Sequence, residues 1–155
     1  MPEYGLMFTL DADYENIKWY GYGAEENYID RKHGAKLGVY ENKVINNMSK
    51  YLRPQECGNK EGVRYALVTD DKNRGLIFVA DEKEGFSFSA LPYSPSQLEE
   101  IGYSYELGKI YHTFVRVSKA RLGVGGDDSW GAKTHDEFRL QSKGKMHFSF
   151  SFKGI

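Results

Sequence analysis

The sequence lacks the marks of several protein classes. Cys57 is the only cysteine, so no disulfide can form within the chain, and a lone thiol fits a reducing compartment. Charge of one sign is not in excess, because 21 basic and 22 acidic residues leave a formal net charge of −1. Nucleic acid is therefore not an expected partner. No apolar run is long enough to cross a bilayer, and Met1–Leu10 lacks the pattern of a signal peptide. We expect a cytoplasmic protein with no membrane partner.

Familiar catalytic and metal-binding motifs are also missing. The four histidines show no metal-ligand spacing with one another or with Cys57. There is no nucleophile elbow, phosphate-binding loop or dinucleotide fingerprint. Nothing near Cys57 would stabilise a thiolate, so we interpret it as a buried or incidental thiol rather than a nucleophile. The sequence predicts no catalytic residue, no metal and no cofactor in this chain.

Aromatic residues and glycine are plentiful, with 12 Tyr, 9 Phe, 2 Trp and 17 Gly. This combination favours short strands joined by tight turns. Apolar residues alternate with polar ones over 146–152 and again over 86–90, a pattern that predicts half-buried strands. Further strands are expected at 6–10, 17–20 and 111–117, in a hairpin formed by 63–69 and 75–80, and at 138–140, which should pair with the C-terminal strand.

One short helix is well signalled. Ser94 can be its N-cap, Pro95 suits the first helical position, and Gln97 completes a capping box. Gly102 would end it. The segment 44–52 has apolar residues at helical spacing but is closely followed by a proline, so its state is ambiguous. The whole pattern predicts one all-β domain over residues 1–155, an antiparallel β-sandwich with one short helix.

The most unusual stretch is the glycine-rich, acidic segment 123–131, which carries Trp130. An exposed Trp130 could stack on the apolar C–H face of a galactose ring, with Asp127 and Asp128 supporting the loop. Alternatively, Trp130 is buried in the core beneath a turn. Adjacent carboxylates point to opposite sides of an extended chain, so Asp127 and Asp128 do not form a glycosidase pair. A calcium site would need more ligands than the loop offers.

Two other polar stretches have two interpretations each. The segment 25–31 could be a polar wall of a binding site, or an internal network in which Arg31 pairs with Asp30 or Glu26 and Asn27 binds loop backbone. The internal network is favoured. In the segment 53–59, Arg53 and Glu56 could bind a ligand, and a rigid proline–glycine loop explains the same residues equally well.

Taken in order, these stretches resemble one family. Its motifs are a proline-started strand, G-x-G-P-x-E-N-Y-P-D-R, P-Q-E-x-G, a strand-to-helix step and G-x-G-G-D-D-S-W. The matching segments here are 2–5, 21–31, 53–58, 90–98 and 123–130. The family is the C-terminal domain, or small chain, of the glycoside hydrolase family 2 β-galactosidases. This chain departs from the pattern at Glu3, Ala24 and Ile29, where the family usually has arginine, proline and proline.

The resemblance implies a supersandwich of the galactose mutarotase type, with part of the sandwich upstream of residue 1. It also implies that Trp130 is an aromatic platform for substrate in a β-galactosidase that cleaves lactose-type galactosides. The catalytic glutamates, magnesium and sodium would lie in a TIM-barrel partner. We expect this chain to be inactive alone and to form oligomers. The alternatives are a stand-alone carbohydrate-binding module or, on fold analogy alone, an epimerase using His112 or His135.

Overall fold

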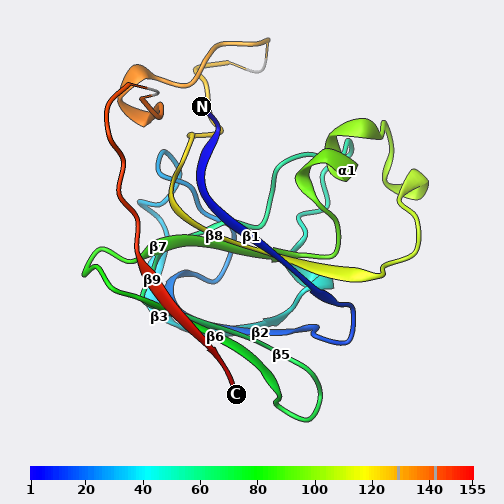
Figure 1. The fold of residues 1–155 in the computed structure, drawn as a ribbon. Coiled ribbons are helices and arrows are strands. Elements are labelled where there is room, and N and C mark those ends of the chain that lie inside the picture. The colour runs from blue at the N-terminus through cyan, green and yellow to red at the C-terminus, as the bar shows by residue number, and fades with distance from the viewer. Residues whose placement is uncertain (129, 142) are drawn as a thin grey trace.

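The computed structural model describes residues 1–128, 130–141 and 143–155, which fold into two antiparallel β-sheets packed face to face (Figure 1). The prediction of an all-β sandwich is confirmed. One sheet has the strand order β1 (Glu3–Asp11), β8 (His112–Arg121), β7 (Phe86–Leu91) and β4 (Lys60–Val63). The other has the order β3 (Lys36–Lys43), β2 (Asn16–Gly23), β5 (Tyr65–Thr69), β6 (Gly75–Ala80) and β9 (Phe150–Gly154).

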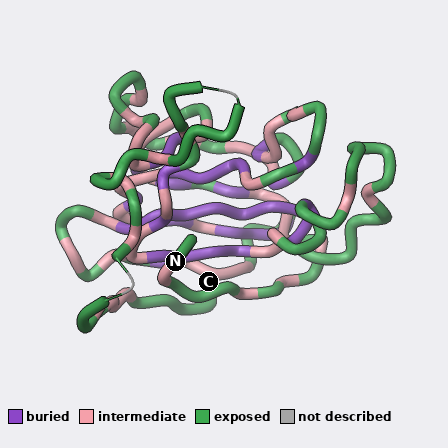
Figure 2. Tube along the Cα trace, turned by 90° about the horizontal axis from the view of Figure 1, so that it is seen from above, coloured by how far each residue is buried: buried purple, intermediate pink, exposed green. Residues whose placement is uncertain are grey.

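The main core lies between the two sheets, and Figure 2 shows the buried residues concentrated along the central strands. One sheet contributes Phe88 and Val117, and the other contributes Trp19, Val68 and Phe78. Successive side chains of a strand point to opposite faces, so each strand places every second residue in this layer. The apolar residues that alternate along the strands therefore point into this core.

The alternation in β7 does not produce a half-exposed strand. Ser87 and Ser89 are as buried as Phe86 and Phe88, with which they alternate. Ser87 donates a hydrogen bond to Glu61, and the guanidinium of Arg116 donates one to Ser89. The face of this sheet that points away from the core is therefore covered by a buried polar layer, which corrects the expectation of a solvent-facing side.

The hairpin prediction is confirmed for β5 and β6, which pair from Thr69 opposite Gly75 to Tyr65 opposite Val79. Asp70 closes the turn by accepting hydrogen bonds from the backbone N–H groups of Lys72 and Arg74. The expected first strand was too long, because the segment that ends at Val63 belongs to β4 in the opposite sheet.

The C-terminal segment differs from its prediction. The strand covers only 150–154 rather than 146–152, and its partner is β6. The strand expected at 138–140 is absent from these described residues, and a single 3-10 turn spans 136–138. Its carbonyl at Phe138 accepts a hydrogen bond from Gly123, so this segment braces the loop that follows β8 instead of extending a sheet.

The helix prediction is confirmed by α1 (Pro95–Glu100), the one α-helix among the described residues. Ser94 and Gln97 form the reciprocal capping box. Leu98 packs in a second, smaller core with Cys57, Leu91 and Tyr93. The ambiguous segment 44–52 contains one 3-10 turn, Ile45–Asn47. A further 3-10 turn, after α1, spans Ser104–Glu106.

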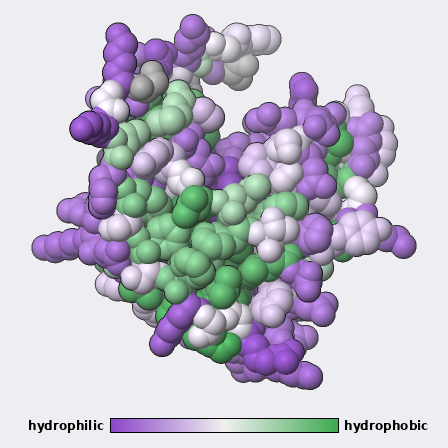
Figure 3. Space-filling view, in the orientation of Figure 1, coloured by the Kyte–Doolittle hydropathy of each residue, from purple (hydrophilic) through white to green (hydrophobic). Residues whose placement is uncertain are grey.

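One side of the sandwich is open and apolar. Where β1 and β9 form the edges of their sheets, Figure 3 shows a broad hydrophobic surface. Phe8 of β1 contacts Phe152 of β9 with ring centroids 5.1 Å apart, and Leu6 and Phe152 remain 57% and 54% exposed. Within the described ranges, no helix has the length and apolar character needed to cross a membrane.

Candidate functional site

Trp130 stands on the loop after β8 and is 93% exposed. Asp128 shapes this turn, because its carboxylate accepts hydrogen bonds from the backbone N–H groups of Trp130 (2.8 Å) and Ala132 (3.1 Å). The interpretation of Trp130 as a core plug is therefore wrong. Ser129, the motif residue between them, lies outside the described residues. The loop presents a large aromatic side chain to its surroundings.

The base of this loop is tied to the rest of the domain. The Asp30 carboxylate accepts a hydrogen bond from the Gly125 N–H at 2.7 Å, and the Thr134 hydroxyl donates one to the Gly123 carbonyl at 2.8 Å. Side chains would not fit here. A Cβ at Gly123 would lie 2.6 Å from the Asp30 carboxylate, and one at Gly126 would overlap the carbonyl oxygen of Ala132. The glycines of the motif thus permit close approach of the backbone.

Asp127 contacts His135, with its carboxylate oxygen 2.8 Å from Nε2 of the imidazole. This hydrogen bond, and the charge of Asp127, raise the pKa of His135. Both side chains are exposed, so the pair does not occupy a closed pocket of the kind an epimerase would require. His112, the other histidine considered for such a reaction, packs edge-on against Phe114.

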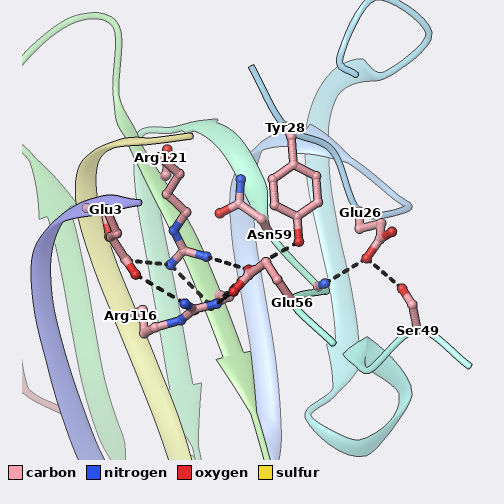
Figure 4. Close-up of polar contacts among 12 residues, drawn as sticks. Glu3, Glu26, Tyr28, Ser49, Glu56, Asn59, Arg116 and Arg121 are labelled. Carbon is pink, nitrogen blue, oxygen red and sulfur yellow. Dashed lines mark hydrogen bonds and ion pairs between the residues drawn. The ribbon is translucent and has the colours of Figure 1, made fainter. Parts of the chain in front are cut away.

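Two arginines of β8 form a buried network with carboxylates from other segments (Figure 4). The side chains of Arg116 and Arg121 are only 7% and 4% exposed. Arg116 binds both oxygens of Glu56, at 2.7 and 2.8 Å, and one oxygen of Glu3 at 3.1 Å. Arg121 contacts the same two carboxylates, and Tyr28 donates a hydrogen bond to Glu56. We call these five residues the arginine network.

Electrostatics favours the charged state of Glu3 and Arg116, whereas burial and the neighbouring Arg116 lower the pKa of Arg121. Burial alone would raise the pKa of Glu3, but Arg121 and Arg116 beside it hold that pKa below its ordinary value. Burial opposes the charge of Arg116 in the same way, and Glu56 and Glu3 overcome it and raise the pKa of Arg116. Two buried cations are thus held by two carboxylates, so losing any one carboxylate would leave uncompensated buried charge.

A second carboxylate, Glu26, organises the neighbouring loops. It accepts hydrogen bonds from Ser49 (2.6 Å), from Tyr51 and from the Gly58 N–H (2.8 Å), and it pairs with Arg31 at 3.3 Å. Burial raises its pKa, but these donors together hold the pKa below its ordinary value. The favoured interpretation of 25–31 as an internal network is confirmed for the pair of Arg31 with Glu26.

Asn27 supports the same loop through backbone contacts. Its side-chain oxygen accepts a hydrogen bond from the Glu61 N–H at 2.8 Å, and its carbonyl accepts one from the Asn59 side chain at 2.9 Å. Its side-chain amide donates a hydrogen bond to the Glu25 carbonyl at 3.1 Å, so the expectation that Asn27 binds loop backbone is confirmed. Of the residues considered as ligand-binding in 53–59, Glu56 is engaged by Arg116 and Arg121. The Pro–Gly loop therefore contributes Glu56 to the arginine network.

The site joins segments that are far apart in the sequence. A cavity of about 460 Å³ lies between the arginine network and the start of the Trp130 loop. Its walls come from the N-terminal strand, the 25–31 loop, the 53–58 loop, the end of β8 and the loop itself; they include Pro2, Glu3, Tyr28, Glu56, Arg116, Arg121 and Gly123. Sequence reasoning did not identify Arg116 and Arg121. The one available signal was that both faces of strand 111–117 looked partly covered.

Comparison with known proteins identifies relatives over nearly the whole chain. A family model described as β-galactosidase small chain matches residues 1–152. The β-galactosidases of Priestia megaterium and Streptococcus thermophilus are 44% and 47% identical to this chain over 155 and 154 residues, which is 100% and 99% of it. That of Lactobacillus delbrueckii subsp. bulgaricus is 43% identical over 92% of it. The chain spans only about 15% of the length of the first two relatives.

Proposed function

This chain belongs to the β-galactosidase small-chain family, and we propose that it completes the active-site wall of an enzyme that hydrolyses terminal β-D-galactosides of the lactose type. In this proposal Trp130 is the aromatic platform on which the substrate rests. Asp127 and Asp128 hold the loop that carries it. The observation behind the proposal is that Trp130 is 93% exposed. The loop that carries it is held by hydrogen bonds to Asp30 and Asp128.

Exposure at this position has an energetic cost that a function would explain. A tryptophan buries a large apolar area when it enters a core, so leaving it exposed forgoes a large part of its stabilising contribution. The flat ring suits the C–H face of galactose, and its N–H can bind a hydroxyl. Asp30, Asp128 and Thr134 of this chain make hydrogen bonds that hold the loop, and a platform held in place in advance loses less entropy when substrate binds.

We place the chemistry in another part of the enzyme, a TIM-barrel portion that would be the partner of this chain. Glycosidases use two carboxyls roughly 5–10 Å apart across the scissile bond. Here Asp128 binds backbone N–H groups and Asp127 binds His135. The residues described in this structure also contain no group of three or more His, Cys, Asp or Glu able to hold a metal. In this proposal magnesium and sodium are held by the barrel portion.

A stand-alone carbohydrate-binding module is the second candidate. It is favoured by the observation that Asp30 and Thr134 of this chain hold the base of the Trp130 loop. The two functions differ in what the isolated chain does. A module binds galactosides with useful affinity without a partner, whereas an active-site wall supplies one contact among several and binds weakly until the catalytic portion is present.

The experiment compares Trp130→Ala with Tyr105→Ala, a matched removal of another exposed aromatic ring. Each variant is mixed with a catalytic chain that lacks this region, and hydrolysis of a chromogenic β-galactoside is followed. We expect Trp130→Ala to lower kcat/KM by about tenfold, equivalent to about 1.4 kcal/mol of lost contact. Tyr105→Ala should be near wild type. Equal effects from both variants would contradict the platform proposal.

A further inference from the structure

Lys60, the first residue of β4, has a buried side chain. The residue is only 2% exposed. Its Nζ lies 5.2 Å from the centroid of the Trp19 ring. Among the described residues its ammonium has no ion pair, although Glu26 and Glu25 lie near enough to favour its charge. Burial outweighs them and lowers the pKa of Lys60 to about 8. A buried ammonium without an ion pair destabilises the fold unless another group hydrogen-bonds to it.

The space beside this ammonium is a polar pocket of about 390 Å³. Lys60 and Trp19 form part of its wall, and the remaining walls carry hydrogen-bonding groups: Glu25, Glu26, Asn46, Asn47, Ser49 and Lys50. Asn47 is itself buried and donates to the carbonyls of Gly58 and Ala90, while its own side-chain oxygen has no partner in the part of the chain that is described. That oxygen is closed to solvent, so the pocket offers one unused donor, the Lys60 ammonium, beside the polar side chains of Glu25 and Asn46 on its wall.

The charges around the pocket select the class of ligand. An anion would bind Lys60 but would be repelled by Glu25, Glu26 and Glu41, which line the same space. A cation would meet Lys60 and Lys50. A hydroxyl group accepts a hydrogen bond from an ammonium and donates one to a carboxylate or carboxamide oxygen, so it satisfies both kinds of group at once. A molecule with several hydroxyls fits this lining best.

We propose that the pocket over Lys60 is a binding site for a single hexopyranose, with one sugar hydroxyl accepting a hydrogen bond from Lys60 and others donating to Glu25 and Asn46. The pocket volume lies within the range of small-ligand sites, which is roughly 300–1,000 Å³. This site shares no residue with the Trp130 loop or the arginine network, so it does not depend on the function proposed above.

The test measures how fast each lysine of the 155-residue chain reacts with acetic anhydride, by mass spectrometry, with and without D-galactose. At galactose concentrations about ten times the dissociation constant, the labelling rate of Lys60 should fall about tenfold by mass action. Lys109, an exposed lysine outside the pocket, should be unaffected. The protection should persist in Trp130→Ala, and binding measured by calorimetry should be lost in Lys60→Met but kept in Lys109→Met.

Three results would overturn the proposal. Lys60 could label at the same rate at every galactose concentration, which would mean that no sugar enters the pocket. Its protection could disappear in Trp130→Ala, which would place the sugar at the exposed loop. Lys60→Met could bind galactose as wild type does. The labelling experiment uses the unaltered chain, so the proposal is tested even if a Lys60 variant fails to fold.

Discussion

Replacing Glu56 with glutamine removes one of the two carboxylates that hold the buried guanidinium groups of Arg116 and Arg121. Glutamine has the same shape, so packing is kept while the charge is lost. Removing one partner of a buried ion pair typically lowers the free energy of unfolding by about 3–5 kcal/mol. The Glu56 side chain is 33% exposed and glutamine keeps one acceptor oxygen, so solvent and the remaining hydrogen bond reduce this cost. We expect a loss of about 2 kcal/mol of unfolding free energy.

The matched control is Glu41→Gln. Glu41 pairs with Lys18 at 2.6 Å, a short distance, but both side chains are largely exposed. Exposed pairs contribute roughly 0–1 kcal/mol, so this variant should be close to wild type. Urea unfolding followed by circular dichroism measures both. For a chain of this size, a loss of about 2 kcal/mol corresponds to a Tm lower by about 4–8 °C. If Glu56→Gln and Glu41→Gln are equally stable, the arginine network does not stabilise the domain as described.

Three further predictions follow from particular contacts. The pKa values of Glu3 and Glu26 are lowered in the folded state, so their contribution to stability is complete above the ordinary carboxyl range, roughly pH 4–5, and is lost as pH falls through their folded pKa values. Urea midpoints measured from pH 7 to pH 3 should therefore drop steeply at the acid end, and a flat profile would refute this. Gly126→Ala should disturb the Trp130 loop, because its Cβ would overlap the Ala132 carbonyl, and should lower activity in the complementation assay, whereas Gly108→Ala has open space and should not. The exposed apolar edges at β1 and β9 should make the isolated chain self-associate, and Leu6→Lys should reduce the mass seen by light scattering. A clean wild-type monomer at high concentration would count against that expectation.

The sequence was most informative where local rules decide the structure. The capping box of Ser94 and Gln97 and the turn between β5 and β6 depend on neighbouring residues, and both were predicted correctly. The antiparallel sandwich also followed from alternation. Its supersandwich type is not tested by this structure and stays a prediction.

Long-range pairing could not be predicted in the same way. The hydroxyls of Ser87 and Ser89 look solvent-facing in the sequence, because nothing nearby in the chain indicates that Glu61 and Arg116 cover them. Glu3 appeared only as a departure from the family pattern, yet it binds Arg116 from 113 positions away. Such partners are set by the register of β1 on β8, where Glu3 lies opposite Arg121.

The candidate site was predicted in outline. The exposure of Trp130 could not be decided from composition, since large aromatic residues usually enter a core. The family resemblance favoured an exposed ring, and the structure places it in the open. The hydrogen bond from Gly125 to Asp30, which holds the base of the loop, joins residues 95 positions apart and could be found only from the fold. The same is true of the nearby arginine network, whose members come from four separate segments of the chain.

Hydrolysis of a chromogenic β-galactoside tests the central claim most directly. The 155-residue chain is assayed alone and after mixing with a matching β-galactosidase catalytic chain that lacks this region. The account predicts no turnover from either chain alone and turnover from the mixture. Turnover by this chain alone would contradict it, because the catalytic carboxylates would then have to lie within these residues.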